Sequence, residues 1–185
     1  MSLRQSAQII SDEVRRVVDR LDDDQAEDLT LAIQNARTIV VAGVGREGLA
    51  GRSFAMRLMH LGFDAHWVWD DTCPPVSVDD LLLTVSGSGE IGHLDHIVNM
   101  AIAAGSHVAV VTAVPTGMTA QKADHVLSVP AKVYKGEGEL VPSVQPMGSL
   151  FEESVWICFD ALVLELVRIT GHSHAELSER HRNVE

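Results

Sequence analysis

The sequence predicts an α/β protein of three layers, with helices on both faces of a doubly wound sheet of five parallel strands. Two observations favour this class. Short apolar runs alternate with helical patterns between residues 37 and 130, as in βαβ units with right-handed crossovers. The clearest run, Leu81–Val85, is apolar or β-branched throughout, which is typical of a strand buried on both faces of a parallel sheet.

The length of 185 residues is enough for one domain whose core needs neither disulfides nor a metal. We expect a single domain over residues 1–185. Its N-terminal helices occupy residues 1–36, its sheet residues 37–130 and its C-terminal helices residues 147–185.

The composition indicates a cytoplasmic protein that binds neither membranes nor nucleic acid. Cys73 and Cys158 lie far apart without metal-ligand spacing, as expected in a reducing compartment. The N-terminus has no apolar signal core, and Asp160 and Glu165 interrupt the most apolar C-terminal run. The formal net charge is −12, whereas a nucleic-acid binder needs a basic face. An acidic protein can bind a phosphate only with local donors, so basic residues beside glycine loops are candidate phosphate ligands.

The first 36 residues predict two helices. An acidic segment over residues 21–28 separates them. We expect Asp22–Asp24 to cap the second helix and to charge its first turn. A metal site is the weaker interpretation, since no oxygen-ligand loop with a central glycine follows.

Five strands are expected after this point, three of them followed by helices. The strands are residues 38–42, 65–69, 81–85, 107–112 and 125–129. The helices run to about Leu61, from Glu90 to about Ala104, and over Gly117–Ala123, with Gly105 closing the second. Residues 70–79 contain two consecutive prolines and are a loop.

The C-terminal third predicts a polar loop at residues 132–144, a long helix over residues 149–170, and a short polar helix and tail over residues 173–185. Apolar residues occupy nearly every side of the long helix, so we expect it to be buried on all sides. Because one small sheet cannot cover both of its faces, other subunits are expected to cover the rest.

The segment Ser86–Glu90 predicts an anion site rather than a flexible turn. Ser86 and Ser88 offer hydroxyl donors, while Gly87 and Gly89 allow a tight turn that points backbone N–H groups inward. A helix follows the loop, and its N-terminal N–H groups and partial positive charge favour a phosphate.

An earlier loop, Gly43-x-Gly45-x-x-Gly48, matches the dinucleotide fingerprint, and Asp70 stands where a ribose-binding acid would lie. Two features count against a dinucleotide. Two helices precede the loop, and a second loop of hydroxyl donors follows the third strand. Arg46 is better explained as a charge that faces a small phosphorylated ligand, although a dinucleotide-binding oxidoreductase stays an alternative.

These motifs resemble the sugar isomerase (SIS) domain family and, within it, the 6-phospho-3-hexuloisomerases. The resemblance is carried by Ser86–Glu90, Gly43–Arg46, Phe54–Phe63, Gln145–Glu152 and Arg180–Glu185, which span almost the whole chain. It implies a five-stranded parallel sheet, a homotetramer with sites near subunit interfaces, and interconversion of a 3-hexulose 6-phosphate with fructose 6-phosphate. That reaction is the second step of formaldehyde assimilation through ribulose monophosphate.

The chain departs from the family pattern at the site itself. Ile91 replaces a threonine after the loop glutamate, and Glu47 replaces a serine after the arginine. In the tail, Arg182 and Val184 replace an alanine and a leucine. A carboxylate at position 47 repels a phosphate unless it points away.

The resemblance also assigns the site residues. Moving a carbonyl to its neighbouring carbon needs a base and an acid acting through a cis-enediol. Glu152 is the expected base and His181 the expected acid, which can come from a neighbouring subunit. The residues expected to bind the sugar phosphate are Gly45, Arg46, Ser86, Gly87, Ser88, Gly89 and Glu90. No cofactor is expected and no metal, since His93 and His96 have no evident third ligand.

Two other interpretations stay open. Glu152 can be an ordinary first-turn charge that favours the helix dipole. The protein can then be a non-catalytic module that binds a sugar phosphate or a partner, because the same loop serves both roles and such a module needs neither Glu152 nor His181.

Overall fold

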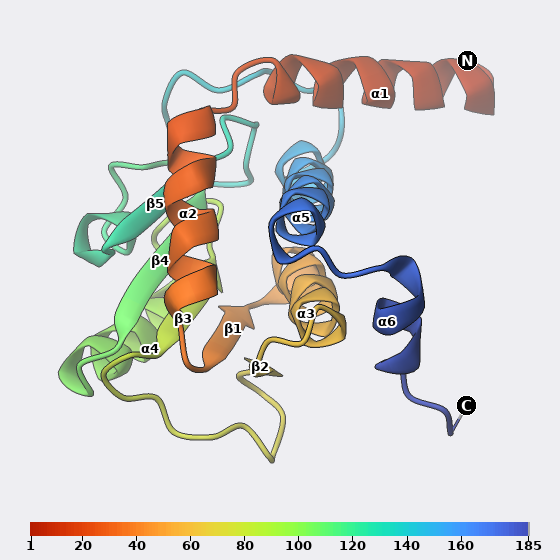
Figure 1. Ribbon diagram of the computed structural model, residues 1–185. Helices are drawn as coiled ribbons and strands as arrows, with labels where there is room; N and C mark the ends of the chain where they lie inside the picture. The colour runs from red at the N-terminus through yellow and green to blue at the C-terminus, as the bar shows by residue number, and fades with distance from the viewer. Residues whose placement is uncertain (185) are drawn as a thin grey trace.

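The computed structural model describes residues 1–184 and has three layers (Figure 1). Five parallel strands form one sheet in the order β2-β1-β3-β4-β5, which confirms the predicted fold class. The strands are β1 Ile39–Gly43, β2 Ala65–Trp67, β3 Leu81–Val85, β4 His107–Thr112 and β5 His125–Ser128. In a doubly wound sheet of this order the direction of winding reverses between β1 and β3, and ligands bind outside the carboxyl ends of these two strands.

The register of β1 and β3 brings two distant loops together. The strands pair from Ile39 opposite Leu81 to Gly43 opposite Val85. Both strands therefore end at the same level of the sheet. The residues that follow them, 44–48 and 86–90, leave the same edge as neighbours.

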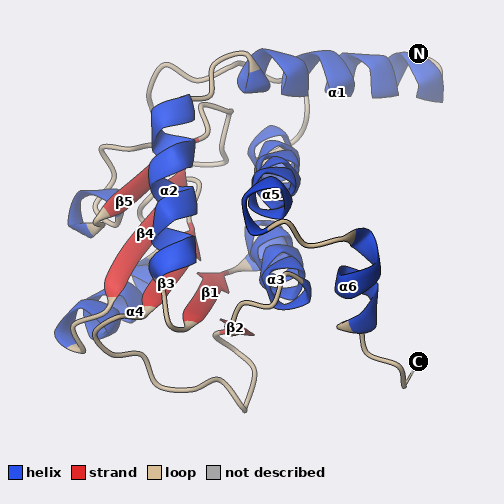
Figure 2. Cartoon of the chain, in the orientation of Figure 1, coloured by secondary structure: helices blue, strands red, loops and turns tan. Residues whose placement is uncertain are grey.

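Helices cover both faces of the sheet (Figure 2). They are α1 Leu3–Val18, α2 Asp23–Asn35, α3 Gly45–His60, α4 Gly92–Ala103, α5 Ser149–Thr170 and α6 His174–Glu179, with a 3-10 turn η1 at Ala120–Lys122. Ile39 and Val41 of β1 pack in the core under α1, α2, α3 and α5. Val40 and Ala42, which point the opposite way, pack under α4 and η1.

The long helix α5 begins and ends at the predicted residues. Its buried side meets α3, where the rings of Phe54 and Phe159 stack with centroids 4.3 Å apart. One side of α5 is exposed in the single chain, where other subunits were expected to cover it. Trp156 and Ile157 are each 45% exposed and Leu164 is 72% exposed, because none of the described elements covers that side.

Some predicted boundaries move by a few residues. α4 begins at Gly92 rather than Glu90, because Ile91 has an extended backbone and serves as the N-cap. β2 ends at Trp67 rather than Trp69. The short helix expected after β4 is reduced to the single turn η1.

The predicted cap of α2 is confirmed. The Asp22 side chain caps α2 by accepting hydrogen bonds from the N–H groups of Asp24 and Gln25. Cys73 and Cys158 are free thiols. Of the helices in residues 1–184, none combines the length and the apolar character that crossing a membrane requires.

Candidate active site

The first loop places Arg46 and Glu47 at the start of α3. A Cβ atom on Gly43 would lie 2.8 Å from the Cα of Gly48, so these glycines allow the helix to touch β1. Gly45 has a φ of +58°, a conformation that favours glycine. The sheet order also differs from that of the dinucleotide-binding fold. The glycine fingerprint therefore serves helix–strand packing here, and Arg46 and Glu47 occupy the first turn of α3.

The second loop, which we call the serine loop (residues 86–90), follows β3. The Ser86 hydroxyl is buried and has no hydrogen-bond partner among residues 1–184. Ser88 Oγ accepts a hydrogen bond of 3.3 Å from the Glu90 N–H, and the Glu90 side chain is exposed. No side chain in the described chain caps α4. The serine loop and the first turn of α4 therefore keep donors that suit an anion.

Glu152, in the first turn of α5, lies at the same edge of the sheet as the two loops. Its carboxylate is ion-paired with the Arg46 guanidinium. The Glu152 side chain is 16% exposed, whereas that of Arg46 is 64% exposed. The hydrogen bond to Glu152 and its charge raise the pKa of Arg46. Arg46 was expected to face the phosphate, but in this structure its partner is the predicted catalytic base.

Glu47 points into the serine loop. Its Oε2 accepts a hydrogen bond of 2.9 Å from the Gly87 N–H. Burial raises the pKa of Glu47 to about 7, the Gly87 N–H opposes this by lowering it, and the charge of Glu152 adds to the rise. The sequence left open whether the Glu47 carboxylate points away from the loop, and the structure shows that it points in. Gly87, one of the predicted phosphate ligands, has its N–H engaged by this carboxylate.

A groove of about 370 Å³ lies beside the ion pair. Its lining residues are Arg46, Leu49, Glu152, Glu153, Trp156 and Ile157. The volume falls within the range of small-molecule sites, and the groove combines apolar walls with a charged pair. Sequence reasoning did not identify Leu49 and Trp156 as groove residues, because apolar residues on nearly every side of the long helix gave no sign of which side is exposed in the chain.

His181 lies at the C-terminal end of α3, whereas Arg46 lies at its N-terminal end. The His181 ring stacks on that of His60, with centroids 5.1 Å apart, and Arg180 donates a hydrogen bond of 3.1 Å to the His60 carbonyl. His60 is the last residue of α3, and a helix of 16 residues is about 24 Å long. The structure thus brings Gly45, Arg46, the serine loop and Glu152 together within one chain, but not His181.

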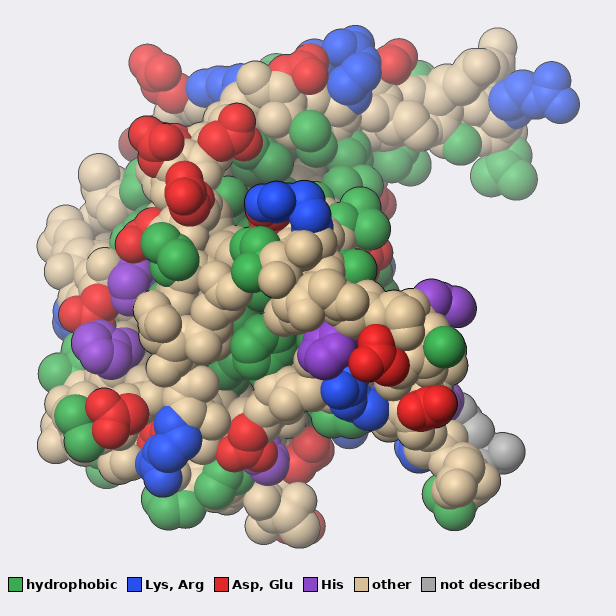
Figure 3. Space-filling view, in the orientation of Figure 1, with side chains coloured by type: hydrophobic (Ala, Val, Ile, Leu, Met, Phe, Trp, Pro, Cys, Tyr) green, Lys and Arg blue, Asp and Glu red, His purple; other side chains and the backbone are tan. Residues whose placement is uncertain are grey.

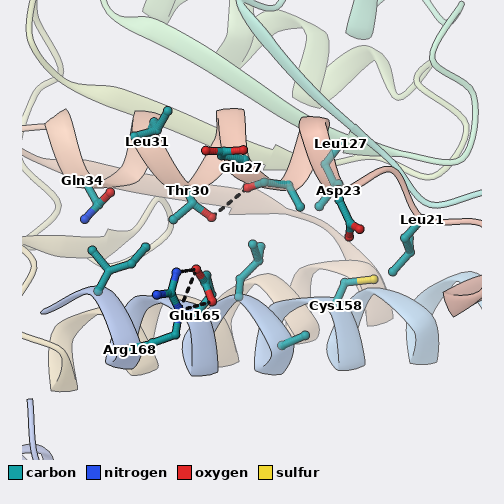
Figure 4. Close-up of a pocket in the computed structure, with 14 residues that line it drawn as sticks. Leu21, Asp23, Glu27, Thr30, Leu31, Gln34, Leu127, Cys158, Glu165 and Arg168 are labelled. Atoms are coloured by element: carbon teal, nitrogen blue, oxygen red, sulfur yellow. Dashed lines mark hydrogen bonds and ion pairs between the residues drawn. The ribbon is translucent and has the colours of Figure 1, made fainter. Parts of the chain in front are cut away.

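A larger groove of about 520 Å³ runs between α2 and α5 (Figure 4). Leu21, Leu31 and Leu127 contribute to its lining, and the Glu165–Arg168 ion pair lies along it. None of the predicted site residues lines this groove. The part of the chain that the structure describes also contains no group of three or more His, Cys, Asp or Glu side chains placed to hold a metal ion.

The chain is similar to a family model and to known enzymes. The SIS domain family model matches residues 32–152. The 3-hexulose-6-phosphate isomerase of Bacillus subtilis is 35% identical over 165 residues, covering 89% of each protein. The enzyme of the same name from Mycobacterium gastri is 36% identical, covering 96% of this chain and 88% of that enzyme.

A solved structure agrees with these relatives. A crystal structure from Methanococcus jannaschii, from which a function as 3-hexulose-6-phosphate isomerase was inferred, superimposes with a TM-score of 0.85 at 29% identity. The match covers 98% of this chain and 99% of that one. The family model, the two enzymes and the shared fold agree over most of the sequence, and the chain belongs to the SIS domain family.

Proposed function

We propose that the protein is a sugar-phosphate isomerase that converts D-arabino-3-hexulose 6-phosphate to fructose 6-phosphate. One observation carries the proposal. The β1–β3 register brings Arg46 and the serine loop together, and an ion pair with Arg46 adds Glu152, in a chain that is 35% identical to the Bacillus subtilis enzyme of that name. The phosphate would bind the free donors of the serine loop and the first turn of α4.

The proposed reaction proceeds through a cis-enediol. The Glu152 carboxylate takes the proton from C2 of the 3-hexulose, and the C2–C3 enediol forms as the C3 carbonyl oxygen gains a proton. Return of the proton from Glu152 to C3, with loss of the C2 hydroxyl proton, gives the C2 ketone of fructose 6-phosphate. Arg46 holds the carboxylate before substrate binds and can stabilise negative charge on the enediol oxygens.

The direct test is isomerisation in D2O. Purified protein incubated with fructose 6-phosphate should form a 3-hexulose phosphate, and NMR should detect deuterium at C3 of the recovered fructose 6-phosphate. Exchange at C3 is expected because the proton on the base equilibrates with solvent before it returns to carbon. Binding of fructose 6-phosphate without product and without exchange would instead identify a non-catalytic sugar-phosphate module.

The proposal extends to a cytoplasmic homotetramer of single-domain subunits with shared sites. α1 and α6 project from the body on the same side and leave a hollow surface with exposed hydrophobic side chains (Figure 3). Trp156, Ile157 and Leu164 give α5 an apolar side that no element within residues 1–184 covers. His181 is far from Glu152 of its own chain, so as an acid it would serve the site of a neighbouring subunit. Light scattering coupled to size-exclusion chromatography tests the tetramer.

A further inference from the structure

The Glu47 carboxylate occupies part of the anion site that the proposed function requires. Its Oε2 bonds the Gly87 N–H, and a Cβ atom on Gly87 would lie 2.8 Å from its Oε1. The carboxylate therefore fills the space beside Gly87 as well as its donor. A phosphate placed on the serine loop would meet a negative charge already bound there.

We propose that Glu47 is a built-in competitor for the phosphate, which must give up the Gly87 N–H before a phosphorylated ligand can use the whole serine loop. This inference rests on the proposed function, since it assigns a specificity role within the same site. Glu47 sets how tightly the loop holds an anion. Glu47 thereby favours ligands whose sugar makes enough additional contacts to displace its carboxylate.

The surroundings of Glu47 support displacement rather than a permanent tether. Val133 and Phe151 pack against the same side of Gly87 and are apolar, so they give the carboxylate no second hydrogen bond. The charged group facing it from α5 is Glu152, which repels it, and Arg46 on its own helix is engaged by Glu152. Desolvation of the carboxylate and the like charge of Glu152 therefore oppose the attraction of the Gly87 N–H.

Protonation of Glu47 would remove the competition. Since burial raises the pKa of this carboxyl to about 7, the neutral form is abundant at pH 6 and scarce at pH 8. If only the neutral form yields the loop, anion affinity falls about tenfold between these pH values. Besides Glu152 and the exposed Glu90, a further titratable side chain near the loop in sequence is that of His93, in the first turn of α4, whose ring packs against that of Trp69 with centroids 4.9 Å apart.

The test is calorimetric titration of the full-length protein with sulfate, a dianion throughout this range, and with fructose 6-phosphate. Wild type should bind sulfate about tenfold more weakly at pH 8 than at pH 6. E47Q keeps an acceptor for the Gly87 N–H without the charge, and E47S removes the carboxylate altogether. Both should bind sulfate about tenfold more tightly than wild type at pH 8 and match it at pH 6.

Two controls isolate the effect. H93Q should keep the pH dependence of wild type, and D12N, which removes a remote exposed charge on α1, should bind as wild type at both pH values. Equal sulfate affinity of wild type and E47Q at pH 8, or a wild-type profile that H93Q alone flattens, would overturn the inference. If either variant fails to fold, the other variant decides.

The outcome is separable from that of the proposed function. Isomerase activity with no effect of Glu47 on anion binding would sink this inference alone. A clear effect of Glu47 on sulfate binding in a protein that does not isomerise fructose 6-phosphate would sink the proposed reaction alone.

Discussion

Arg46 on α3 is ion-paired with Glu152 on α5, and the pair closes the edge of the sheet beside the serine loop. The two helices are held in this relation by the stacked rings of Phe54 and Phe159 and by the glycine contact between α3 and β1. The proposed base is thus held in place by a cation before substrate arrives.

The variant E152Q should therefore lose the isomerase reaction while retaining its ligand. Glutamine keeps the shape and a hydrogen-bond acceptor for Arg46 but cannot take a proton from carbon. We expect turnover of fructose 6-phosphate to fall at least about 100-fold, with the dissociation constant changed less than about threefold. Kinetics and calorimetry on the same preparation measure both. D160N, a matched carboxylate-to-amide change on the exposed side of α5, should keep wild-type turnover. Unchanged turnover in E152Q would remove this residue from the mechanism.

Subunit mixing tests the role of His181. H181A should lower turnover about 100-fold, as expected for loss of an acid. If the tail completes a neighbouring site, refolding H181A and E152Q together should create some sites that contain both native residues. Random pairing of equal amounts then restores about a quarter of wild-type activity. Activity no higher than the mean of the two variants would confine each site to one chain.

Much of this architecture was predictable, because it depends on local patterns. The strands Leu81–Val85 and His107–Thr112 and the helix Ser149–Thr170 have the predicted bounds. Apolar runs and helical periodicity are properties of neighbouring residues. A loop of hydrogen-bond donors between a strand and a helix can likewise be recognised from the residues Ser86–Gly89 themselves.

The contacts that define the site could not be predicted in the same way. The bond between Glu47 and Gly87 depends on the register of β1 and β3, and the pairing of Arg46 with Glu152 depends on how α3 packs against α5. The distance of His181 from Glu152 follows from the length of α3 and from the fold of the tail onto His60. Each is a tertiary relation between segments far apart in the chain.

The free energy of unfolding should depend on pH through the buried carboxyl group of Glu47. Folding raises the pKa of this carboxyl from its ordinary value of 4.5 to about 7, so the folded state binds more protons than the unfolded state between these values. Stability contributed by the neutral form is therefore complete below pH 4.5 and is lost as the pH rises to 7. We expect E47Q to exceed wild type by about 3 kcal/mol in free energy of unfolding at pH 8.

Urea unfolding at pH 5, 6 and 8 measures this difference. The advantage of E47Q should shrink as the pH falls, to less than about 1 kcal/mol at pH 5, since the carboxyl is then neutral in the folded protein and partly protonated in the unfolded one. A difference that is constant across this range would mean that the charge of Glu47 does not titrate in the folded protein.

At the opposite edge of the sheet, the exposed Arg37 is ion-paired with a buried carboxylate. The Asp80 carboxylate, whose side chain is fully buried, accepts hydrogen bonds of 3.1 and 2.8 Å from Arg37 and one of 2.7 Å from the Ser77 N–H. Burial raises the pKa of Asp80, but these bonds outweigh it and hold the pKa below its ordinary value of 3.8. D80A should lower the free energy of unfolding by about 3 kcal/mol, because it leaves the Ser77 donor unpaired and removes the partner of Arg37.

The pH dependence of this pair has the opposite sign to that of Glu47. Because the folded pKa of Asp80 lies below the unfolded value, its stabilisation is present above pH 3.8 and is lost as the pH falls further. The difference in free energy of unfolding between wild type and D80N, measured in urea, should therefore be largest at pH 6 and should become smaller below pH 3.8. The exposed residue Asp71 supplies the control, since D71N should shift the free energy of unfolding by less than about 0.5 kcal/mol. If D80N and D71N unfold at the same urea concentration at pH 6, the Asp80 charge does not hold this edge of the sheet.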